Sequence, residues 1–503
     1  MILRKAMLLK RFCTTTKFQT FCLIFSVFGM LHIMSSISEL KILQLKSSSP
    51  VTTVVKSGNN PVYWLSANNA DSGYMNHVKE TFKAVGFDRW NEKSGDWDVM
   101  WSYEYPFGKA ITSTTLKPHQ KVNHFPGSGY LTSKGYLAMS KSRYIPLAFS
   151  LPQNLTDFKK YIEKHPEKMW VQKNNKHRGI KIKTKKELDF SAPDSFIQEF
   201  VRKPFLVDRR KFDVGIYTVI TSINPLTVYV LDNEWLIRFC PEDYEPFDSG
   251  NVRKYVVEDD YTPTWEMPSL KTGYKNMKLS HKESLLQHLK TIGLNEKKVV
   301  DDLYAAVSEL IWEKQPDIIR SVGYYPYGTR SFFELVRFDF VLDEDLNVYA
   351  MEVNMSPNLS SGHFADNARM YRQVIFNTLS LVGIAMQREH SATKNIFEEE
   401  MSVSNRDIVA YPEECLKCKY CLDHICKLCS QCMVIPVENS LKIAYKHHVN
   451  RRNFKRVYPK PLGDKDSASL YNPVKDKRLR TDLDKMLALW YKGKCLQDLS
   501  WCI

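Results

Sequence analysis

Two carboxylates interrupt the apolar segments of residues 338–354, FDFVLDEDLNVYAMEVN. If the segments pair as an antiparallel hairpin, Asp339 lies directly opposite Glu352, and Asn354 shares their face because side chains alternate along a strand. Two carboxylates and a neutral oxygen suit Mg²⁺, which takes few protein ligands and keeps positions for substrate phosphates. The alternative is a structural ion pair with Arg337 as the partner. The hairpin therefore predicts either a magnesium site or a buried salt bridge.

The other face of this hairpin is predicted to be core. Like charges placed opposite each other destabilise a sheet by up to ~1 kcal/mol, so a positive group is expected beside the two carboxylates. The predicted core residues are Phe338, Phe340 and Leu342 on the first strand, against Tyr349, Met351 and Val353 on the second.

A second group of polar residues lies in WVQKNNKHRGIKI, residues 170–182. A strand delivers Lys173, a polar loop follows, and Arg178, Gly179 and Ile180 lead into the next strand. Glycine lets the backbone approach a phosphate, and lysine supplies a point charge. The segment therefore fits a phosphate-binding hairpin, although a lysine-rich surface hairpin has the same pattern.

Further polar positions follow on short strands downstream. Residues 196–201, FIQEFV, form a strand with polar groups for an adenine edge. Lys211 and Asp213 lie at the start of another strand, and Arg238 lies in WLIRFC. Each is an ordinary strand-end charge when taken singly, so their order along the chain is the informative feature.

The elements that carry these residues indicate an α+β fold. Residues 62–103 alternate strand-like and helix-like pieces, which predicts an N-terminal α/β subdomain. From residue 170 to about residue 387, β-branched and aromatic runs predict strands. A helical insert is expected at residues 282–314 and a closing helix at 369–386.

The N-terminal region carries a candidate membrane segment. Phe21–Ile37 is a run of 17 residues without a charge, and basic residues precede it. It is just long enough to span a bilayer, and the basic flank predicts a single-pass, type II membrane protein. A cleaved signal peptide and a membrane-peripheral segment are the alternatives.

The chain is basic, with a formal charge of +15. This charge favours an acidic partner. Since no RNA-recognition or zinc-finger signature accompanies it, an acidic polypeptide fits the charge as well as nucleic acid does. Together with the motifs described below, we expect an acidic polypeptide and no nucleic acid. The basic stretch at residues 442–460 is either a solvated tail or a contact for an acidic polymer.

Six cysteines cluster near the C-terminus with repeated Cys-x-x-Cys spacing. In reducing surroundings this spacing predicts a Zn²⁺ site, and in oxidising surroundings it predicts three disulfides. The six are Cys415, Cys418, Cys421, Cys426, Cys429 and Cys432.

Taken in order, these motifs resemble the tubulin tyrosine ligase-like family, which is built on an ATP-grasp fold. The resemblance covers roughly residues 97–386, and the last motif is the most specific. The matching pieces are WDVMWSY (97–103), VNHFPG (122–127), the Lys173 strand, FIQEFV (196–201), RKFD (210–213), Arg238 and FELVRFDFVLDEDLNVYAMEVNMSP (333–357).

The resemblance implies a role for each candidate residue. Asp339, Glu352 and Asn354 would hold Mg²⁺, and Arg238 would grip a carboxylate of the donor or acceptor, which a guanidinium can do bidentately. ATP would be contacted by Lys173, Arg178, Gly179, Ile180, Lys211 and Asp213, with Gln198, Glu199, Phe200 and Val201 lining the adenine pocket.

The resemblance also implies a reaction. ATP phosphorylates a substrate carboxylate, and the amine of an amino acid attacks the acyl phosphate to form a peptide or isopeptide bond. Glutamate is the expected amino acid, and acidic tubulin tails on microtubules are the expected acceptor. The alternatives are a nucleotide-binding pseudoenzyme or scaffold that binds an acidic partner, and a ligase that uses another amino acid or a lumenal acceptor.

Three positions depart from the family pattern. Gly215 stands where the pattern Lys-Phe-Asp-x-Arg has arginine, so a cation near the reacting carboxylates is missing unless another residue replaces it. Residues 256–261, VVEDDY, lack the His and Asn of the His-x-Thr-Asn motif, and Asn174 replaces a proline.

The expected domain order follows from these segments. It is a basic N-terminal segment (1–20), a transmembrane signal-anchor (21–38), a linker (39–60), an ATP-grasp catalytic domain (61–390) and a basic cysteine-rich region (391–503).

Overall fold

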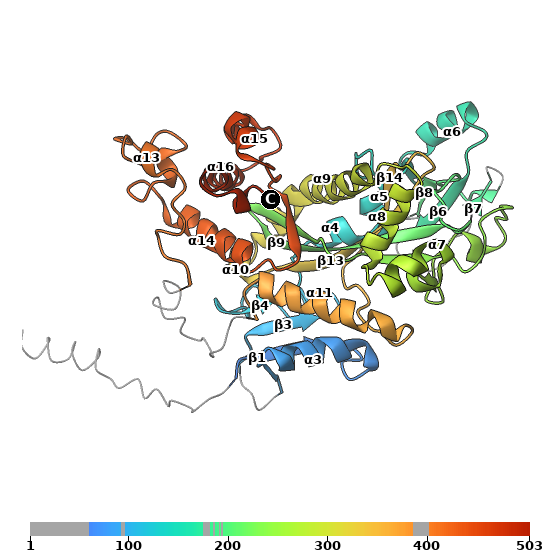
Figure 1. Cartoon of the computed structure of the whole chain (residues 1–503), viewed down its shortest axis with the longest axis horizontal. Helices are drawn as coiled ribbons and strands as arrows, with labels where there is room; N and C mark the ends of the chain where they lie inside the picture. The colour runs from blue at the N-terminus through green and yellow to red at the C-terminus, as the bar shows by residue number, and fades with distance from the viewer. Residues whose placement is uncertain are drawn as a thin grey trace, which may run out of the picture. The chain divides into compact units, whose positions relative to one another are not determined.

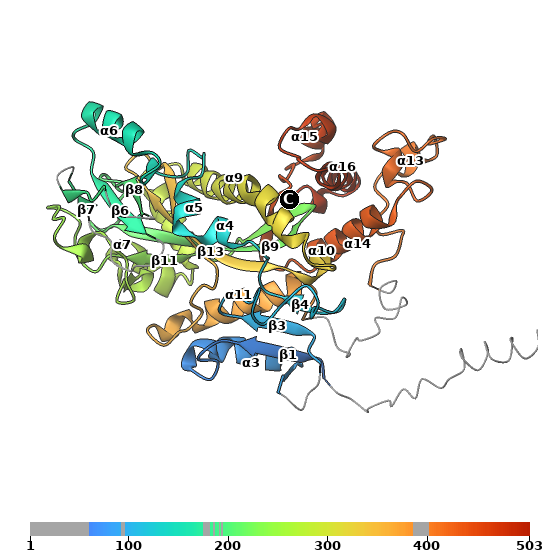
Figure 2. The same ribbon diagram turned by 180° about the vertical axis from the view of Figure 1, so that it is seen from behind.

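The computed structural model describes residues 60–91, 96–174, 182–184, 187–190, 192, 195–385 and 402–503 (Figures 1 and 2). Three predicted nucleotide contacts, Arg178, Gly179 and Ile180, lie outside the described residues.

The N-terminal part is a parallel sheet with helices against it. Its strands are β1 (Val62–Ser66), β2 (Asp88–Arg89), β3 (Val99–Ser102) and β4 (Lys121–Val122), in the order β2-β1-β3-β4. Val78 and Phe82 of α3 (Asn76–Ala84) pack into one apolar cluster with Val374 of α11 (Ala368–Leu381). The predicted closing helix is thus present as α11.

A second sheet carries the predicted phosphate-binding strand. Its antiparallel strands are β5 (Ala148–Ser150), β6 (Trp170–Asn174), β7 (Ile182–Lys183) and β8 (Ser195–Glu199), in the order β5-β8-β6-β7. Phe158 of α6 (Leu155–Lys164) packs against Trp170 and Ile197 on one face. Because side chains alternate along a strand, Lys173 and Gln198 lie on the other face.

The third sheet has seven strands and forms the centre of the molecule. They are β9 (Phe212–Ile223), β10 (Leu226–Leu231), β11 (Leu236–Phe239), β12 (Thr262–Pro263), β13 (Glu334–Leu342), β14 (Val348–Asn354) and β15 (Phe454–Tyr458). Strand β9 pairs with β13 along one edge. Along its other edge, the first residues of β9 pair with β11 and the later residues pair with β10. Asp213, Arg238 and Asp339 are thereby carried on three adjacent strands.

Helices cover both faces of this central sheet, so its strands are apolar on both sides. Helix α9 (Glu296–Val322) presents residues such as Val299, Leu303 and Leu310 to a cluster that includes Ile216, and Tyr217 contributes to the opposite cluster with α11. Figure 1 shows α9 and α11 on opposite sides of β9 and β13. The helical insert predicted at residues 282–314 is α8 (His281–Thr291) followed by α9.

Short helices complete the connections between these layers. They are α4 (Gly129–Thr132), α5 (Lys134–Ala138), α7 (Pro268–Lys271) and α10 (Gly328–Ser331). Helix α8 begins with a capping box, in which the Ser280 side chain accepts from the Glu283 backbone and Glu283 accepts from the Ser280 backbone. This reciprocal pair satisfies two of the amides that a helix start leaves unpaired.

The hairpin of β13 and β14 has the predicted register near Asp339 but not beyond it. Asp339 lies opposite Glu352, as expected, and the register then shifts so that Phe340 lies opposite Ala350. Met351 is therefore the extra residue of a β-bulge. The prediction that Tyr349 and Met351 lie on the core face was wrong, because a slip of one residue exchanges the two faces of the strand. Ala350 occupies the core instead.

The C-terminal residues build their own apolar cluster and also join the central sheet. Their helices are α13 (Pro412–Cys415), α14 (Ile435–Val449), α15 (Lys465–Leu470) and α16 (Asp482–Gln497). Strand β15 pairs antiparallel with β10. The buried Asp484 carboxylate accepts from the Leu226 backbone at 2.7 Å and from Gln315 Nε2 at 3.0 Å. A carboxylate of α16 thus links the C-terminal helices to β10 and α9.

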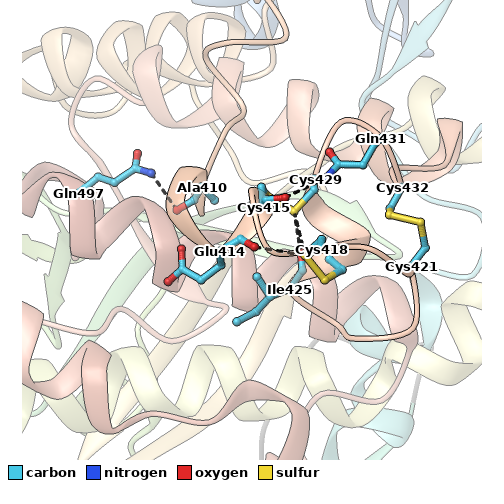
Figure 3. The surroundings of a disulfide bond; sticks show 11 residues. Ala410, Glu414, Cys415, Cys418, Cys421, Ile425, Cys429, Gln431, Cys432 and Gln497 are labelled. Carbon is cyan, nitrogen blue, oxygen red and sulfur yellow. Dashed lines mark hydrogen bonds between the residues drawn. A yellow bond between two sulfur atoms is a disulfide. The ribbon is translucent and has the colours of Figure 1, made fainter.

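The clustered cysteines pair as disulfides, so the structure contains the second of the two predicted alternatives and does not support the zinc site. The pairs are Cys415–Cys429, Cys418–Cys426 and Cys421–Cys432 (Figure 3). Sulfurs bonded to each other are not thiolates and do not ligate zinc. Across the described ranges, no group of three or more His, Cys, Asp or Glu side chains could hold a metal ion. Cys495 and Cys502 form a fourth disulfide.

The membrane prediction is also corrected. In the part of the chain that the structure describes, no helix is long and apolar enough to cross a bilayer. The assignment as a single-pass, type II membrane protein is overturned on this finding. The segment Phe21–Ile37 itself lies outside the described residues.

Candidate active site

Half of the predicted site residues border one cleft of about 1390 Å³. Strands β6, β9, β11, β13 and β14 all contribute to its lining. The predicted residues that line it are Lys173, Lys211, Asp213, Arg238, Asp339, Glu352 and Asn354. Residues separated by up to 181 positions are therefore gathered around one space.

Asp339 is the most heavily bonded of these residues and is buried. Its Oδ1 accepts from Arg337 Nε at 2.6 Å. Its Oδ2 accepts from Arg337 Nη2 at 2.9 Å, Arg238 Nη2 at 3.1 Å and Asn354 Nδ2 at 2.9 Å. Both alternatives for the hairpin are thus partly present: Arg337 is an ion-pair partner, and the three oxygen-bearing side chains also border one cleft.

Arg238 bridges two carboxylates. It donates from Nε to Asp213 Oδ1 at 2.9 Å and from Nη2 to Asp213 Oδ2 at 2.7 Å, in addition to its bond with Asp339. Burial raises the pKa of Asp213, although Arg238 opposes this shift. Burial also disfavours the charge on Asp339, but Arg337 and Arg238 outweigh it and lower the pKa of that carboxyl. The ionised form is therefore more strongly favoured for Asp339 than for Asp213.

Two lysines lie near Glu352. Lys134 Nζ, at the start of α5, is 3.4 Å from Glu352 Oε1. Lys173 Nζ donates to Gln198 Oε1 at 3.1 Å. Burial, together with the charges of Lys134 and Lys211, lowers the pKa of Lys173 to about 8, although Glu352 opposes the shift. Around Lys173, positive charges therefore outnumber the one carboxylate of Glu352, and an anionic ligand bound there would compensate them.

The donor set fits Mg²⁺. A carboxylate has about four lone-pair positions, and Oδ1 of Asp339 accepts one hydrogen bond from the described residues. Asn354 directs its Nδ2 to Asp339, which leaves the amide oxygen available. Glu352 is 39% exposed, so its carboxylate is accessible from the cleft. Two carboxylates and one amide oxygen match the small protein ligand number that Mg²⁺ uses beside phosphates.

Four predicted adenine contacts do not border this cleft. The Gln198 side chain supports Lys173, and Glu199 lies on the opposite face of β8, where it pairs with Lys168. Phe200 is buried under Lys211, whose Nζ is 5.2 Å from the ring centroid. Val201 is likewise absent from the lining.

Lys211 is turned toward the backbone. Its Nζ donates to the Tyr255 carbonyl at 2.8 Å, and burial lowers its pKa. Residues 256–261, which depart from the family motif, border the same cleft. Asp259 and Asp260 both lie in its lining, and Asp260 pairs with Arg253.

Sequence reasoning missed Lys134, which lines the cleft from a short helix. No local sequence pattern marks Lys134, because it lies close to Glu352 only through the packing of α5 beside β14. It also missed the function of His124, whose ring contacts the Glu334 carboxylate at 2.6 Å and the Ser102 carbonyl at 2.8 Å. This buried bridge ties the N-terminal sheet to the start of β13.

Comparisons with known proteins identify the family of this chain. The model of the tubulin-tyrosine ligase family matches residues 112–392, which is more than half of the chain. A Caenorhabditis elegans protein named "Probable tubulin polyglutamylase ttll-15" is 41% identical over 448 residues, covering 86% of this chain and 85% of that protein.

More distant relatives share part of the chain. "Tubulin monoglutamylase TTLL4" of Homo sapiens is 26% identical over 70% of this chain and 30% of that protein. "Probable beta-tubulin polyglutamylase" of Tetrahymena thermophila is 26% identical over 65% of this chain and 29% of that protein. The family match and the relative that aligns over most of both lengths lead to one conclusion: the chain belongs to the tubulin-tyrosine ligase family and has its ATP-grasp-like α+β fold.

Proposed function

We propose that this protein is an ATP-dependent ligase that adds glutamate to side chains of acidic tubulin tails, as a tubulin polyglutamylase. The observation that carries the proposal is the cleft in which Asp339, Glu352 and Asn354 lie with Lys134 and Lys173, in a chain of this family. The relative that matches over most of both chains is named a tubulin polyglutamylase. The chain's charge of +15 suits an acidic acceptor.

The reaction takes ATP, glutamate and an acceptor carboxylate as substrates. The γ-phosphoryl group moves to the acceptor carboxylate and ADP leaves. The glutamate amine then attacks the acyl carbon, phosphate leaves with the C–O bond electrons, and the nitrogen loses a proton. This chemistry requires several anions to be held close together, so positioning and charge neutralisation are the main contributions of the protein.

The cleft residues divide this work. Lys173 and Lys134 supply positive charge for phosphate oxygens, and Asp339, Glu352 and Asn354 would hold Mg²⁺, which neutralises phosphate charge when it is bound. Arg238 grips a carboxylate with the part of its guanidinium that Asp213 and Asp339 do not use. The proposal also assigns nucleotide contacts to Lys211, Asp213 and residues 178–180, whereas the strand end at 198–201 lies outside the cleft lining and acts through Lys173, which Gln198 orients.

A second candidate function is a nucleotide-binding pseudoenzyme that binds an acidic partner. Two observations favour it: Asp339 is already paired with two arginines, and Gly215 and residues 256–261 depart from the family pattern. In this case ATP would bind without ligation.

Labelled glutamate distinguishes these functions. Full-length protein is incubated with ATP, Mg²⁺, microtubules and labelled glutamate, and incorporation into tubulin is counted. We expect incorporation that Glu352→Gln abolishes and Glu344→Gln preserves. Glu344 is the matched control, since it lies in the turn of the same hairpin and pairs with Lys203 on the surface.

Three results would contradict the proposal or redirect it. Binding of a fluorescent ATP analogue without incorporation of any amino acid supports the pseudoenzyme. Incorporation of labelled glycine but not glutamate indicates a ligase with another donor. Incorporation that survives Glu352→Gln refutes the assigned metal site while leaving the ligase activity in place.

A further inference from the structure

The side chain of Arg337 occupies the space above Gly215. In the pairing of β13 with β9, Asp339 lies opposite Gly215 and Arg337 lies opposite Tyr217, so these residues share one face. A Cβ added at position 215 would lie 2.9 Å from Arg337 Cδ and 3.2 Å from the Leu236 carbonyl oxygen. Since real Cβ atoms essentially never approach a neighbour that closely, the present path of Arg337 requires glycine at position 215.

From this position the guanidinium reaches back along its own strand. Arg337 is 6% exposed and donates to both oxygens of Asp339. Its side chain also borders the cleft. Three of the four donors to Asp339 converge on Oδ2, so Oδ1 is the oxygen that retains an acceptor position for a cation.

We propose that Arg337 is a positioning residue of the ligase, which orients Asp339 and places at the cleft the positive charge that the family pattern places at residue 215. Compared with the family pattern, the positive charge is carried by β13 instead of the neighbouring strand β9. The absence of a side chain at Gly215 leaves the space that Arg337 occupies. This inference rests on the proposed function. It removes the main structural argument for a pseudoenzyme, because the missing cation is present.

A purely structural role makes a different prediction. If Arg337 served only to compensate the burial of Asp339, its loss would lower stability, and an arginine supplied from the other strand would have no particular effect on Mg²⁺ or on turnover. If Arg337 positions Asp339 for the reaction, an arginine at residue 215 with glycine at residue 337 would restore function, because the two side chains use the same space.

The test exchanges the two residues in the full-length protein. Arg337→Gly is expected to raise the Mg²⁺ concentration that half-saturates binding of a non-hydrolysable ATP analogue by about 10-fold or more, as partners of metal ligands typically do. We expect kcat for glutamate incorporation to fall about 10²-fold, with a smaller change in KM for microtubules. The exchange variant Arg337→Gly with Gly215→Arg is expected to recover both quantities to within about threefold of the wild-type values. Gly215→Arg alone places two side chains in one space and is expected to lose both.

The matched control is Arg209→Gly. Arg209 is a surface arginine with 73% of its side chain exposed and a φ of 69°, which glycine adopts freely. It should leave Mg²⁺ dependence and kcat unchanged.

Defined outcomes overturn the proposal. They are an Arg337→Gly variant that keeps both Mg²⁺ dependence and kcat within threefold, and an exchange variant that is no better than Arg337→Gly. If Arg337→Gly does not fold, the exchange variant decides the matter: restored folding with restored Mg²⁺ dependence supports the proposal, and any other result refutes it. Failure of the proposed function is separate, because wild-type protein would then bind the ATP analogue with Mg²⁺ but incorporate no amino acid.

Discussion

The lysine at the phosphate-binding strand gives a quantitative test of the cleft. Lys173 has a pKa of about 8 because it is buried beside two other lysines. An ATP phosphate placed next to it would favour the protonated form and raise that pKa again. The protonated lysine therefore binds ATP more tightly than the neutral one. Affinity is fully present below pH 8 and is lost as the pH rises through that value.

The expected size follows from the shift. Moving the pKa from 10.5 to about 8 disfavours the charged lysine by roughly 3 kcal/mol. The attraction between the ammonium and a bound phosphate can offset this free-energy cost. With a free-protein pKa of about 8 and a much higher value in the complex, the dissociation constant of an ATP analogue should rise about 10-fold between pH 7 and pH 9. The complex should take up about half a proton at pH 8.

Isothermal titration calorimetry between pH 7 and pH 9, in buffers of different ionisation enthalpy, measures both quantities. Lys173→Arg is the matched variant, because arginine keeps the charge and does not titrate in this range. It should bind the analogue with an affinity that is nearly independent of pH. A wild-type affinity that does not change between these pH values, or an equal pH dependence in Lys173→Arg, would refute the assignment of Lys173 to the phosphates.

Two further predictions concern the C-terminal region, and a third concerns the hydrogen-bond partner of Lys173. Asp484→Ala should lower the free energy of unfolding by about 3 kcal/mol in urea titrations, because it leaves the buried Leu226 amide and Gln315 Nε2 without their acceptor. In the control Asp482→Ala, the replaced side chain is 97% exposed, so the free energy of unfolding should fall by less than about 1 kcal/mol. Replacing Cys415 and Cys429 together by serine should cost about 3 kcal/mol in the same measurement, since their bond closes a loop with a sequence separation of 14. Gln198→Leu should weaken binding of the ATP analogue about 10-fold, because it removes the acceptor that orients the Lys173 ammonium, and an unchanged affinity would contradict that role.

Local patterns were sufficient to predict several parts of the molecule. The hairpin that carries Asp339 and Glu352 has the predicted pairing at that point, and the expected helices appear as α9 and α11. A hairpin joins segments that are adjacent in sequence, and helix periodicity is also local, so both can be read without knowledge of the rest of the fold.

Other features were beyond such patterns. The bulge at Met351 reversed the faces of Tyr349 and Ala350, and a register shift of one residue leaves no mark in the sequence pattern of alternating side chains. The cysteine spacing permitted zinc or any of the roughly 15 pairings open to six cysteines, so the observed disulfides depend on how the loop folds.

By itself, the sequence determined which residues could do the chemistry: the carboxylates of one hairpin, the lysine of a strand and the order of motifs that marks the family. The tertiary structure alone decided which of them meet. Asp213, Arg238 and Asp339 become neighbours because β9 pairs with β11 on one edge and β13 on the other, and Arg337 lies over Gly215 for the same reason. Such contacts join residues about 25 to 120 positions apart, and they form only when the burial of both faces of the central sheet selects one strand order.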